Sequence, residues 1–177
     1  MPIQMFMKRY FNDIPVEQID SFFGFTTEKS TLYGGRMYDK TEISAYDLRS
    51  MYKMGINLRL PLSNHDASPE EYEANTPLFE KHHRPGNSII ITNDNLARWI
   101  RKDFPDYRLE ASVIKNINSL KKIDKVAGIY DSIILPMSAN EDEAFLISIE
   151  NKAQITLFAN AGCALTCPSK MCYPSIS

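Results

Sequence analysis

The sequence predicts one α/β domain over residues 1–177, built as a (β/α) barrel that is incomplete and holds about six β/α units. Short β-rich runs alternate along the chain with stretches that have helical spacing. The run at residues 88–92 centres on three isoleucines, as expected for a strand that is covered on both faces of a parallel sheet. A complete barrel has eight strands, so a pattern that ends after six units predicts a partial barrel.

Each predicted element rests on a local signal. The predicted strands are residues 31–36, 56–62, 88–92, 108–113, 132–136 and 154–159. The predicted helices are residues 44–54, 68–83, 94–103, 118–126 and 141–151. Ser68 and Pro69 are typical of an N-cap and the first helical residue. The N-terminal segment is expected to form a hydrophobic plug at the bottom of the barrel, with Phe22, Phe23 and Phe25.

The composition is that of an ordinary globular domain. Hydrophobic residues make up 44% and charged residues 24% of the 177 residues, which argues against disorder. The net charge is −2, so no broad positive field would attract a nucleic-acid backbone, although a small nucleic-acid target stays open. The first nine residues lack the apolar region of a signal peptide, and no apolar run reaches the ~20 residues of a membrane helix. We therefore expect a cytoplasmic protein that does not enter a membrane.

Three cysteines lie close together near the end of the sequence. Cys163, Cys167 and Cys172 follow the sixth predicted strand, at the end where barrel proteins build their sites. Thiolates at this spacing could bind an iron–sulfur cluster or zinc, and the alternative is three plain thiols. A tetrahedral site needs a fourth ligand. The candidates for it are His65, which follows the second strand, His82 and His83.

Polar residues follow most of the predicted strands. Those at or just after strand ends are Arg36, Asn64, His65, Asp66, Asn93, Asp94, Ser112, Asn116 and Asn160. In a barrel they would ring one mouth and line a pocket for a peptide or small molecule. The alternative is that they start turns and cap helices, which is our interpretation of Asp94 and Asn95.

Four lysines occupy one stretch with helical spacing. Lys115, Lys121, Lys122 and Lys125 could contact a phosphate group, or they could form a solvated helix face. A solvated helix face is the more common interpretation of lysines at this spacing.

Three stretches, in order along the chain, resemble the collagenase-like peptidase family. Residues 90–93 and 104–112 are similar to a family pattern of strand, helix, Pro-Asp turn and a strand that ends in Ser. Residues 113–119 are similar to the segment that follows that Ser. Residues 157–168 are similar to the family's VNEGCxxxCP element and are the most specific of the three. The family includes proteases and iron–sulfur proteins of RNA and ubiquinone hydroxylation.

The resemblance implies a barrel enzyme with a peptidase-like or hydroxylation-associated role. It implies an iron–sulfur cluster, with zinc or no metal as alternatives, and leaves the substrate open among peptide, RNA and small molecule. Ala161 stands where the family has Glu, which removes that carboxylate. A second hypothesis is therefore a non-catalytic binding or assembly module, whose open sheet edge would be completed by a protein partner.

Overall fold

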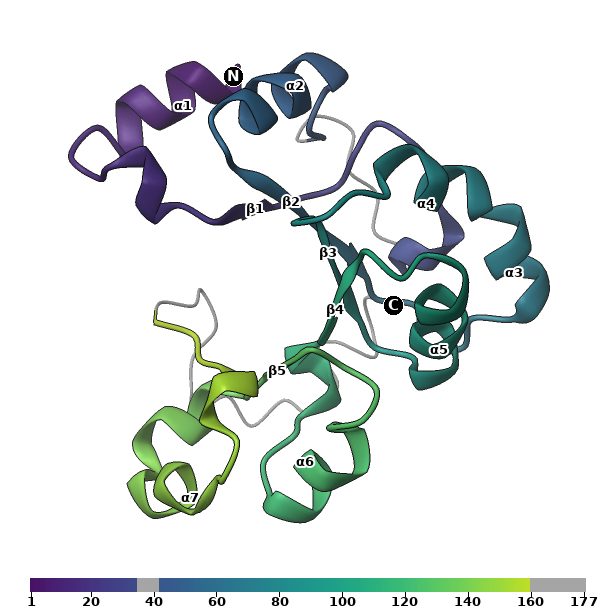
Figure 1. Cartoon of the computed structure of the whole chain (residues 1–177), viewed down its shortest axis with the longest axis vertical. Helices are drawn as coiled ribbons and strands as arrows, with labels where there is room; N and C mark the ends of the chain where they lie inside the picture. The colour runs from purple at the N-terminus through teal and green to yellow at the C-terminus, as the bar shows by residue number, and fades with distance from the viewer. Residues whose placement is uncertain (35–41, 160–177) are drawn as a thin grey trace.

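The computed structural model describes residues 1–34 and 42–159 of the chain. In this part, six parallel strands pair in chain order and form one curled sheet, a half-barrel with helices between the strands (Figure 1). The strands are β1 (Ser21–Phe23), β2 (Asn57–Leu62), β3 (Ser88–Ile91), β4 (Arg108–Ala111), β5 (Ser132–Ile134) and β6 (Ile155–Thr156). The predicted fold class, an incomplete (β/α) barrel, is confirmed.

Seven α-helices and five short 3₁₀ turns lie among the strands in the described part. The α-helices are α1 (Ile3–Tyr10), α2 (Ala45–Lys53), α3 (Pro69–Ala74), α4 (Thr76–His82), α5 (Asp94–Asp103), α6 (Leu120–Val126) and α7 (Glu143–Ser148). The 3₁₀ turns are η1 (Val16–Gln18), η2 (Thr31–Tyr33), η3 (Val113–Lys115), η4 (Met137–Glu141) and η5 (Lys152–Gln154). Helices α2, α4, α5 and α6 lie along the convex side of the sheet (Figure 1). Among residues 1–34 and 42–159, no helix is long and apolar enough to cross a membrane.

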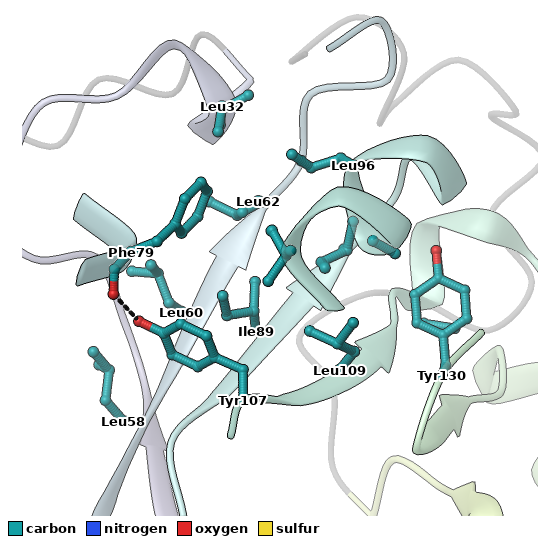
Figure 2. Packing of buried hydrophobic residues seen from close by; sticks show 14 of the residues in the cluster. Leu32, Leu58, Leu60, Leu62, Phe79, Ile89, Leu96, Tyr107, Leu109 and Tyr130 are labelled. Carbon is teal, nitrogen blue, oxygen red and sulfur yellow. Dashed lines mark hydrogen bonds between the residues drawn. The ribbon is translucent and has the colours of Figure 1, made fainter. Parts of the chain in front are cut away.

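The two faces of the sheet differ because side chains alternate along each strand. The outer face carries Leu58, Leu60, Leu62, Ile89, Ile91, Leu109, Ala111 and Ile133, each at most 1% exposed. Together with Phe79 and Leu96 from the helices they form the main core (Figure 2). Full burial of such a side chain contributes roughly 1.5–3 kcal/mol, so this outer layer holds the half-barrel together. The Tyr107 hydroxyl completes it by donating to the carbonyl oxygen of Phe79 at 2.8 Å.

The first predicted strand is wrong. Residues 31–33 form the 3₁₀ turn η2, because the Ser30 hydroxyl accepts from the amide of Leu32 and Gly34 takes the left-handed conformation (φ 73°) that ends the turn. The first strand is instead β1, and it contains Phe22 and Phe23, which were expected to form a plug. Strand β1 lies at the edge of the described sheet, where Phe23 pairs with Arg59 of β2.

The other predicted helices and strands are present, and most of them begin or end at other residues than predicted. The helix predicted over residues 68–83 is split at Asn75 into α3 and α4, because Pro77 cannot continue α3 and fits the first turn of α4, which begins at Thr76. Strand β6 has two residues, and Leu157 to Ala159 lie beyond it. The helix predicted over residues 94–103 is present with these bounds as α5.

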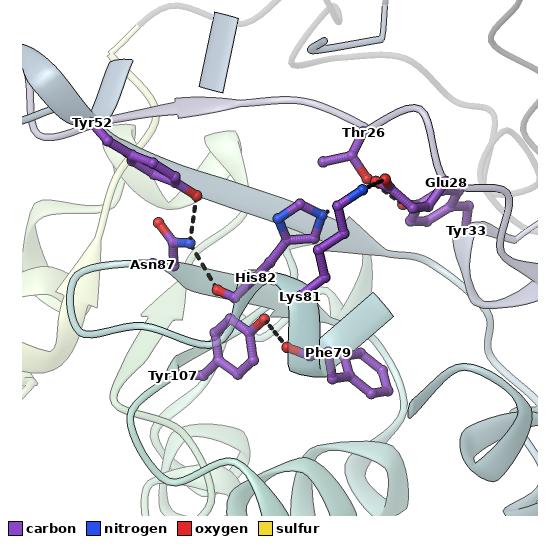
Figure 3. A network of polar contacts seen from close by, with 9 residues as sticks. All are labelled: Thr26, Glu28, Tyr33, Tyr52, Phe79, Lys81, His82, Asn87 and Tyr107. Carbon is purple, nitrogen blue, oxygen red and sulfur yellow. Dashed lines mark hydrogen bonds and ion pairs between the residues drawn. The ribbon is translucent and has the colours of Figure 1, made fainter. Parts of the chain in front are cut away.

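A polar network ties the segment after β1 to helix α4 (Figure 3). The Glu28 carboxylate accepts from the Lys81 ammonium and pairs with the buried imidazole of His82 at 3.2 Å. Burial raises the pKa of Glu28, but hydrogen bonds from Lys81, Thr26 and His82 outweigh burial and lower this pKa to about 2. Burial lowers the pKa of His82, although Glu28 opposes that shift. The network therefore favours an ionised Glu28 beside a neutral His82.

Asn87 joins three elements through a side chain that is 0% exposed. Its oxygen accepts from the amide of Leu58 at 2.9 Å, and its nitrogen donates to the Tyr52 hydroxyl and to the carbonyl of His82, each at 2.9 Å. Each polar atom of the amide thus has a partner in the interior, and Figure 3 shows the two partners of the nitrogen. This residue fixes the start of β3 against β2 and α4.

Candidate functional site

The concave face of the half-barrel holds a cavity of about 530 Å³. It is lined by Phe23, Arg59, Pro61, Ser63, Ile90, Ser112, Val113, Ile114, Ile134, Thr156, Leu157, Phe158 and Ala159. Every strand except β4 contributes a residue, and Ser112 directly follows β4. The volume lies within the range of ordinary ligand pockets, and most of the lining is apolar.

An ion pair crosses this concave face. Arg59 of β2 donates from Nε to Glu110 Oε1 at 3.1 Å and from Nη2 to Glu110 Oε2, a bidentate arrangement. The two residues are two strands apart, so the arginine side chain passes over β3. The Glu110 side chain is 5% exposed and the Arg59 side chain 28% exposed. Glu110 therefore holds Arg59 in place, while part of the arginine side chain stays accessible and lines the cavity.

Hydroxyl groups supply the other polar atoms of the concave face. Ser132 and Thr156 share a hydrogen bond of 2.7 Å between β5 and β6. Ser112 is buried, and its Oγ accepts from the amide of Ile114 at 3.3 Å, so it caps η3 as well as lining the cavity. These contacts tie the start of β5 to the end of β6 and fix the turn that follows β4.

A second, smaller pocket adjoins the first at Ile114. It has a volume of about 380 Å³ and is lined by His65, Thr92, Asp94, Ile114, Lys115, Ile117, Lys122, Lys125 and Val126. Asp94 Oδ1 accepts from Lys115 Nζ and from the Tyr130 hydroxyl, both at 2.7 Å. Burial raises the pKa of Asp94, but the contacts with Lys115 and Tyr130 outweigh burial and lower it. Asp94 is therefore the ionised anchor of this pocket.

The residues of the predicted ring have different surroundings. Ser112 lines the large cavity and His65 lines the small pocket. Asn64 accepts from the amide of Asp66 at 2.9 Å, and Asn116 has a left-handed backbone (φ 49°) at the end of η3. Asn93 caps α5 and donates to the carbonyl of His65 at 2.8 Å. Arg36, Asn160, Cys163, Cys167 and Cys172 lie outside the described residues.

The interpretation of Asp94 as a helix cap is wrong. The Asn93 side chain accepts from the amides of Asn95 and Leu96 and is the cap of α5. Asp94 lies in the first turn, and its carboxylate turns to Lys115 and Tyr130.

Within residues 1–34 and 42–159, no three His, Cys, Asp or Glu side chains gather to hold a metal ion. His65, His82 and His83 all lie in this part of the chain. His82 pairs with Glu28, and His83 Nε2 accepts from the amide of Asp106 at 3.1 Å. His65 keeps an exposed side chain at the small pocket, so it is the freest of the three to serve as a fourth ligand.

Sequence reasoning missed Arg59 and Glu110. The signal was present, because Arg59 lies between Leu58 and Leu60 and Glu110 between Leu109 and Ala111. Strict alternation of this kind assigns the charged residue to the face opposite the leucines. It does not indicate that the two charges meet across an intervening strand.

No protein-family model and no curated protein matches the chain. Among solved structures, the fold is similar to that of the U32 peptidase Mk0906, with a TM-score of 0.60 and 12% sequence identity. The likeness covers 85% of this chain and 63% of that chain, so this chain spans less than two thirds of the length of that peptidase. At this identity the likeness shows the barrel fold alone.

Proposed function

We propose that the chain is a relative of the collagenase-like peptidases that binds a short, largely apolar peptide in its concave cavity. The three sequence stretches that resemble this family support the proposal, as does the fold shared with a U32 peptidase. Arg59 is the residue proposed to contact the peptide, and Glu110 is a positioning residue.

The geometry of Arg59 carries this proposal. Glu110 engages Nε and Nη2, while Nη1 has no hydrogen bond to any described residue. A guanidinium held on one edge offers its other N–H groups, at a fixed angle, to an acceptor such as a peptide carbonyl or carboxylate. Arg59 is also the one cation among the cavity-lining residues of the described part. A peptide therefore fits this wall better than RNA, whose backbone calls for several cations.

The cysteine segment supplies the proposed chemistry. Ala159 lines the cavity, and Cys163 follows it by four residues in the sequence. We propose that Cys163, Cys167 and Cys172 bind an iron–sulfur cluster, with zinc as the alternative. A cluster would supply electron transfer, and zinc would supply a Lewis acid for hydrolysis.

Peptide binding can be tested with a variant that keeps the fold. The double substitution of Arg59→Met and Glu110→Met removes both charges at similar volume, which is close to neutral for stability. Titrating a library of short blocked peptides into wild-type protein should show binding that the double variant weakens about tenfold, as expected for loss of a charge-assisted hydrogen bond. The exposed Arg49 of α2 gives the matched control Arg49→Met. Equal binding by wild type and the double variant would refute the role of Arg59.

The metal proposal has its own test. The protein is prepared without oxygen, and iron, sulfide and zinc are measured beside a variant with Cys163→Ala and Cys167→Ala. Near-stoichiometric iron and sulfide that the variant loses would support a cluster, and stoichiometric zinc would support the zinc alternative. Absence of metal from the wild-type protein would refute both.

A non-catalytic assembly module is the second candidate, and the open sheet favours it. Strands β1 and β6 are the outer strands of the described sheet, and Phe23 at one edge is 55% exposed. Exposed strand edges invite pairing with another chain. Sedimentation analysis of wild type and Phe23→Lys distinguishes the candidates, because an assembly module should associate and the variant should dissociate.

A further inference from the structure

The small pocket beside the concave cavity is rich in positive charge. Three lysines line it against a single aspartate, Asp94. Lys115 donates to Asp94 and to the carbonyl of Thr92 at 2.8 Å, so its ammonium is fixed at the carboxyl end of β3. Lys122 donates to the carbonyl of Asn116 at 2.8 Å. The pocket thus keeps an excess of positive charge after its internal pairing.

Lys125 is the lysine of the pocket whose ammonium has no partner among the described residues. It is exposed on α6, and its ammonium has no hydrogen bond or ion pair with a described residue. One N–H donor of Lys122 is also available, since an ammonium has three and two of them have partners, the Asn116 carbonyl and Asn118 Oδ1.

Thr92 adds an independent observation. Thr92 is 6% exposed and lines the pocket. Among the described residues, its Oγ1 is the one buried side-chain polar atom that has no hydrogen-bond partner. Leaving a hydroxyl buried and unsatisfied costs roughly 1–3 kcal/mol, so such groups need a reason. A hydroxyl at the wall of a cationic pocket has a donor to offer to an anion.

We propose that this pocket binds a phosphoryl group. Thr92 Oγ1 would donate to one oxygen, and the ammonium groups of Lys122 and Lys125 would bind the others, with Lys115 adding positive charge from its anchored position. A dianion suits three cations and a hydroxyl donor better than a neutral ligand does. The proposal is independent of peptide binding, although the pocket meets the concave cavity at Ile114.

Calorimetric titration with inorganic phosphate at constant ionic strength tests the site. The variants Lys125→Gln and Thr92→Val should each raise the Kd for phosphate about five- to tenfold, a typical effect of losing one hydrogen bond to a charged group. The control Lys121→Gln removes a charge from the same helix outside the pocket lining and should leave the Kd unchanged. A second titration with phenyl phosphate distinguishes the source. Tighter binding than inorganic phosphate points to a phosphomonoester ligand, and weaker binding points to free phosphate.

Thr92→Val also separates binding from folding. Valine has nearly the same shape and removes the unsatisfied hydroxyl, so the thermal midpoint should stay unchanged or rise while phosphate affinity falls. The proposal is overturned if wild-type protein does not bind phosphate at millimolar concentration. It is also overturned if Thr92→Val and Lys125→Gln keep the wild-type Kd, or if Lys121→Gln weakens binding equally, which would indicate diffuse charge.

Discussion

At the scale of single residues, the inner face of the half-barrel is organised by a charge pair and the interior by one amide. Glu110 is almost fully buried, so its carboxylate needs the guanidinium of Arg59 as a partner. The side-chain amide of Asn87 forms hydrogen bonds with three different elements, β2, α2 and α4. Glu110 and Asn87 are polar residues at buried positions, which usually hold apolar side chains. Removing the hydrogen bonds of either residue should therefore lower the free energy of unfolding by a measurable amount.

Removal of Arg59 alone should destabilise the protein more than removal of the whole pair. Arg59→Met leaves Glu110 unpaired at low exposure, and the expected loss is about 3 kcal/mol in the free energy of unfolding. Adding Glu110→Met should recover most of this loss, because no buried charge then remains. Urea denaturation of the single and double variants measures the difference. Simple additivity of the two single effects would show that the pair is not coupled.

Asn87→Ala should lower the free energy of unfolding by about 2–4 kcal/mol. The substitution leaves the buried amide of Leu58 without its acceptor and the carbonyl of His82 without its donor. The exposed Asn95 gives the control Asn95→Ala, for which we expect a change within about 0.5 kcal/mol. A small effect at Asn87 would mean that water replaces the amide.

At the scale of elements, strands and helices with their own local signals were predictable, and those defined by distant partners were not. Helix α5 has a capping residue and an amphipathic pattern, and its bounds were predicted from the sequence. Strand β1 has three residues and exists through its pairing with β2, more than thirty positions away. Residues 31–33 have strand-forming side chains, yet the cap from Ser30 and the left-handed Gly34 turn them into η2. Local chemistry outweighs β-propensity there.

The link between the β1–η2 segment and α4 should weaken at low pH. Because the pKa of Glu28 is lowered from 4.5 to about 2 in the folded protein, ionised Glu28 stabilises the fold above pH ~4.5 and loses this effect as the pH falls toward 2. The lowered pKa of His82 acts in the same direction, since a folded state that resists protonation loses stability below the ordinary pKa of 6.5.

The variant Glu28→Gln tests this linkage. It should be about 1–2 kcal/mol less stable than wild type at pH 7, and the gap should shrink between pH 4.5 and 2. Chemical denaturation across this range gives the curve. The control is Glu80→Gln, which removes an exposed carboxylate of α4, the helix that carries Lys81 and His82. A gap that does not change with pH would contradict the ion pair as its cause.

At the scale of the whole molecule, the described strands curl into a half-barrel whose concave face holds the large cavity. The predicted class is confirmed, because alternation of β and α patterns is a property of the sequence itself. The described sheet has six strands, but its first is β1 and not the strand predicted over residues 31–36. The contact between Arg59 and Glu110 spans 51 positions and depends on how the sheet curls, so only the inward direction of each residue could be predicted. The same holds for the small pocket, where Thr92 and Lys125 come from different units of the barrel.

The concave face can be examined by NMR of isoleucine methyl groups during a titration with short blocked peptides. Ile90 and Ile134 line the cavity, whereas their neighbours Ile89 and Ile133 are buried on the outer face and serve as internal controls. We expect the peptides to shift the signals of Ile90 and Ile134 while those of Ile89 and Ile133 stay nearly constant, and the variant with Arg59→Met and Glu110→Met to lose this response. No shift at Ile90 and Ile134, or shifts confined to methyl groups away from the cavity, would contradict a peptide site on the concave face.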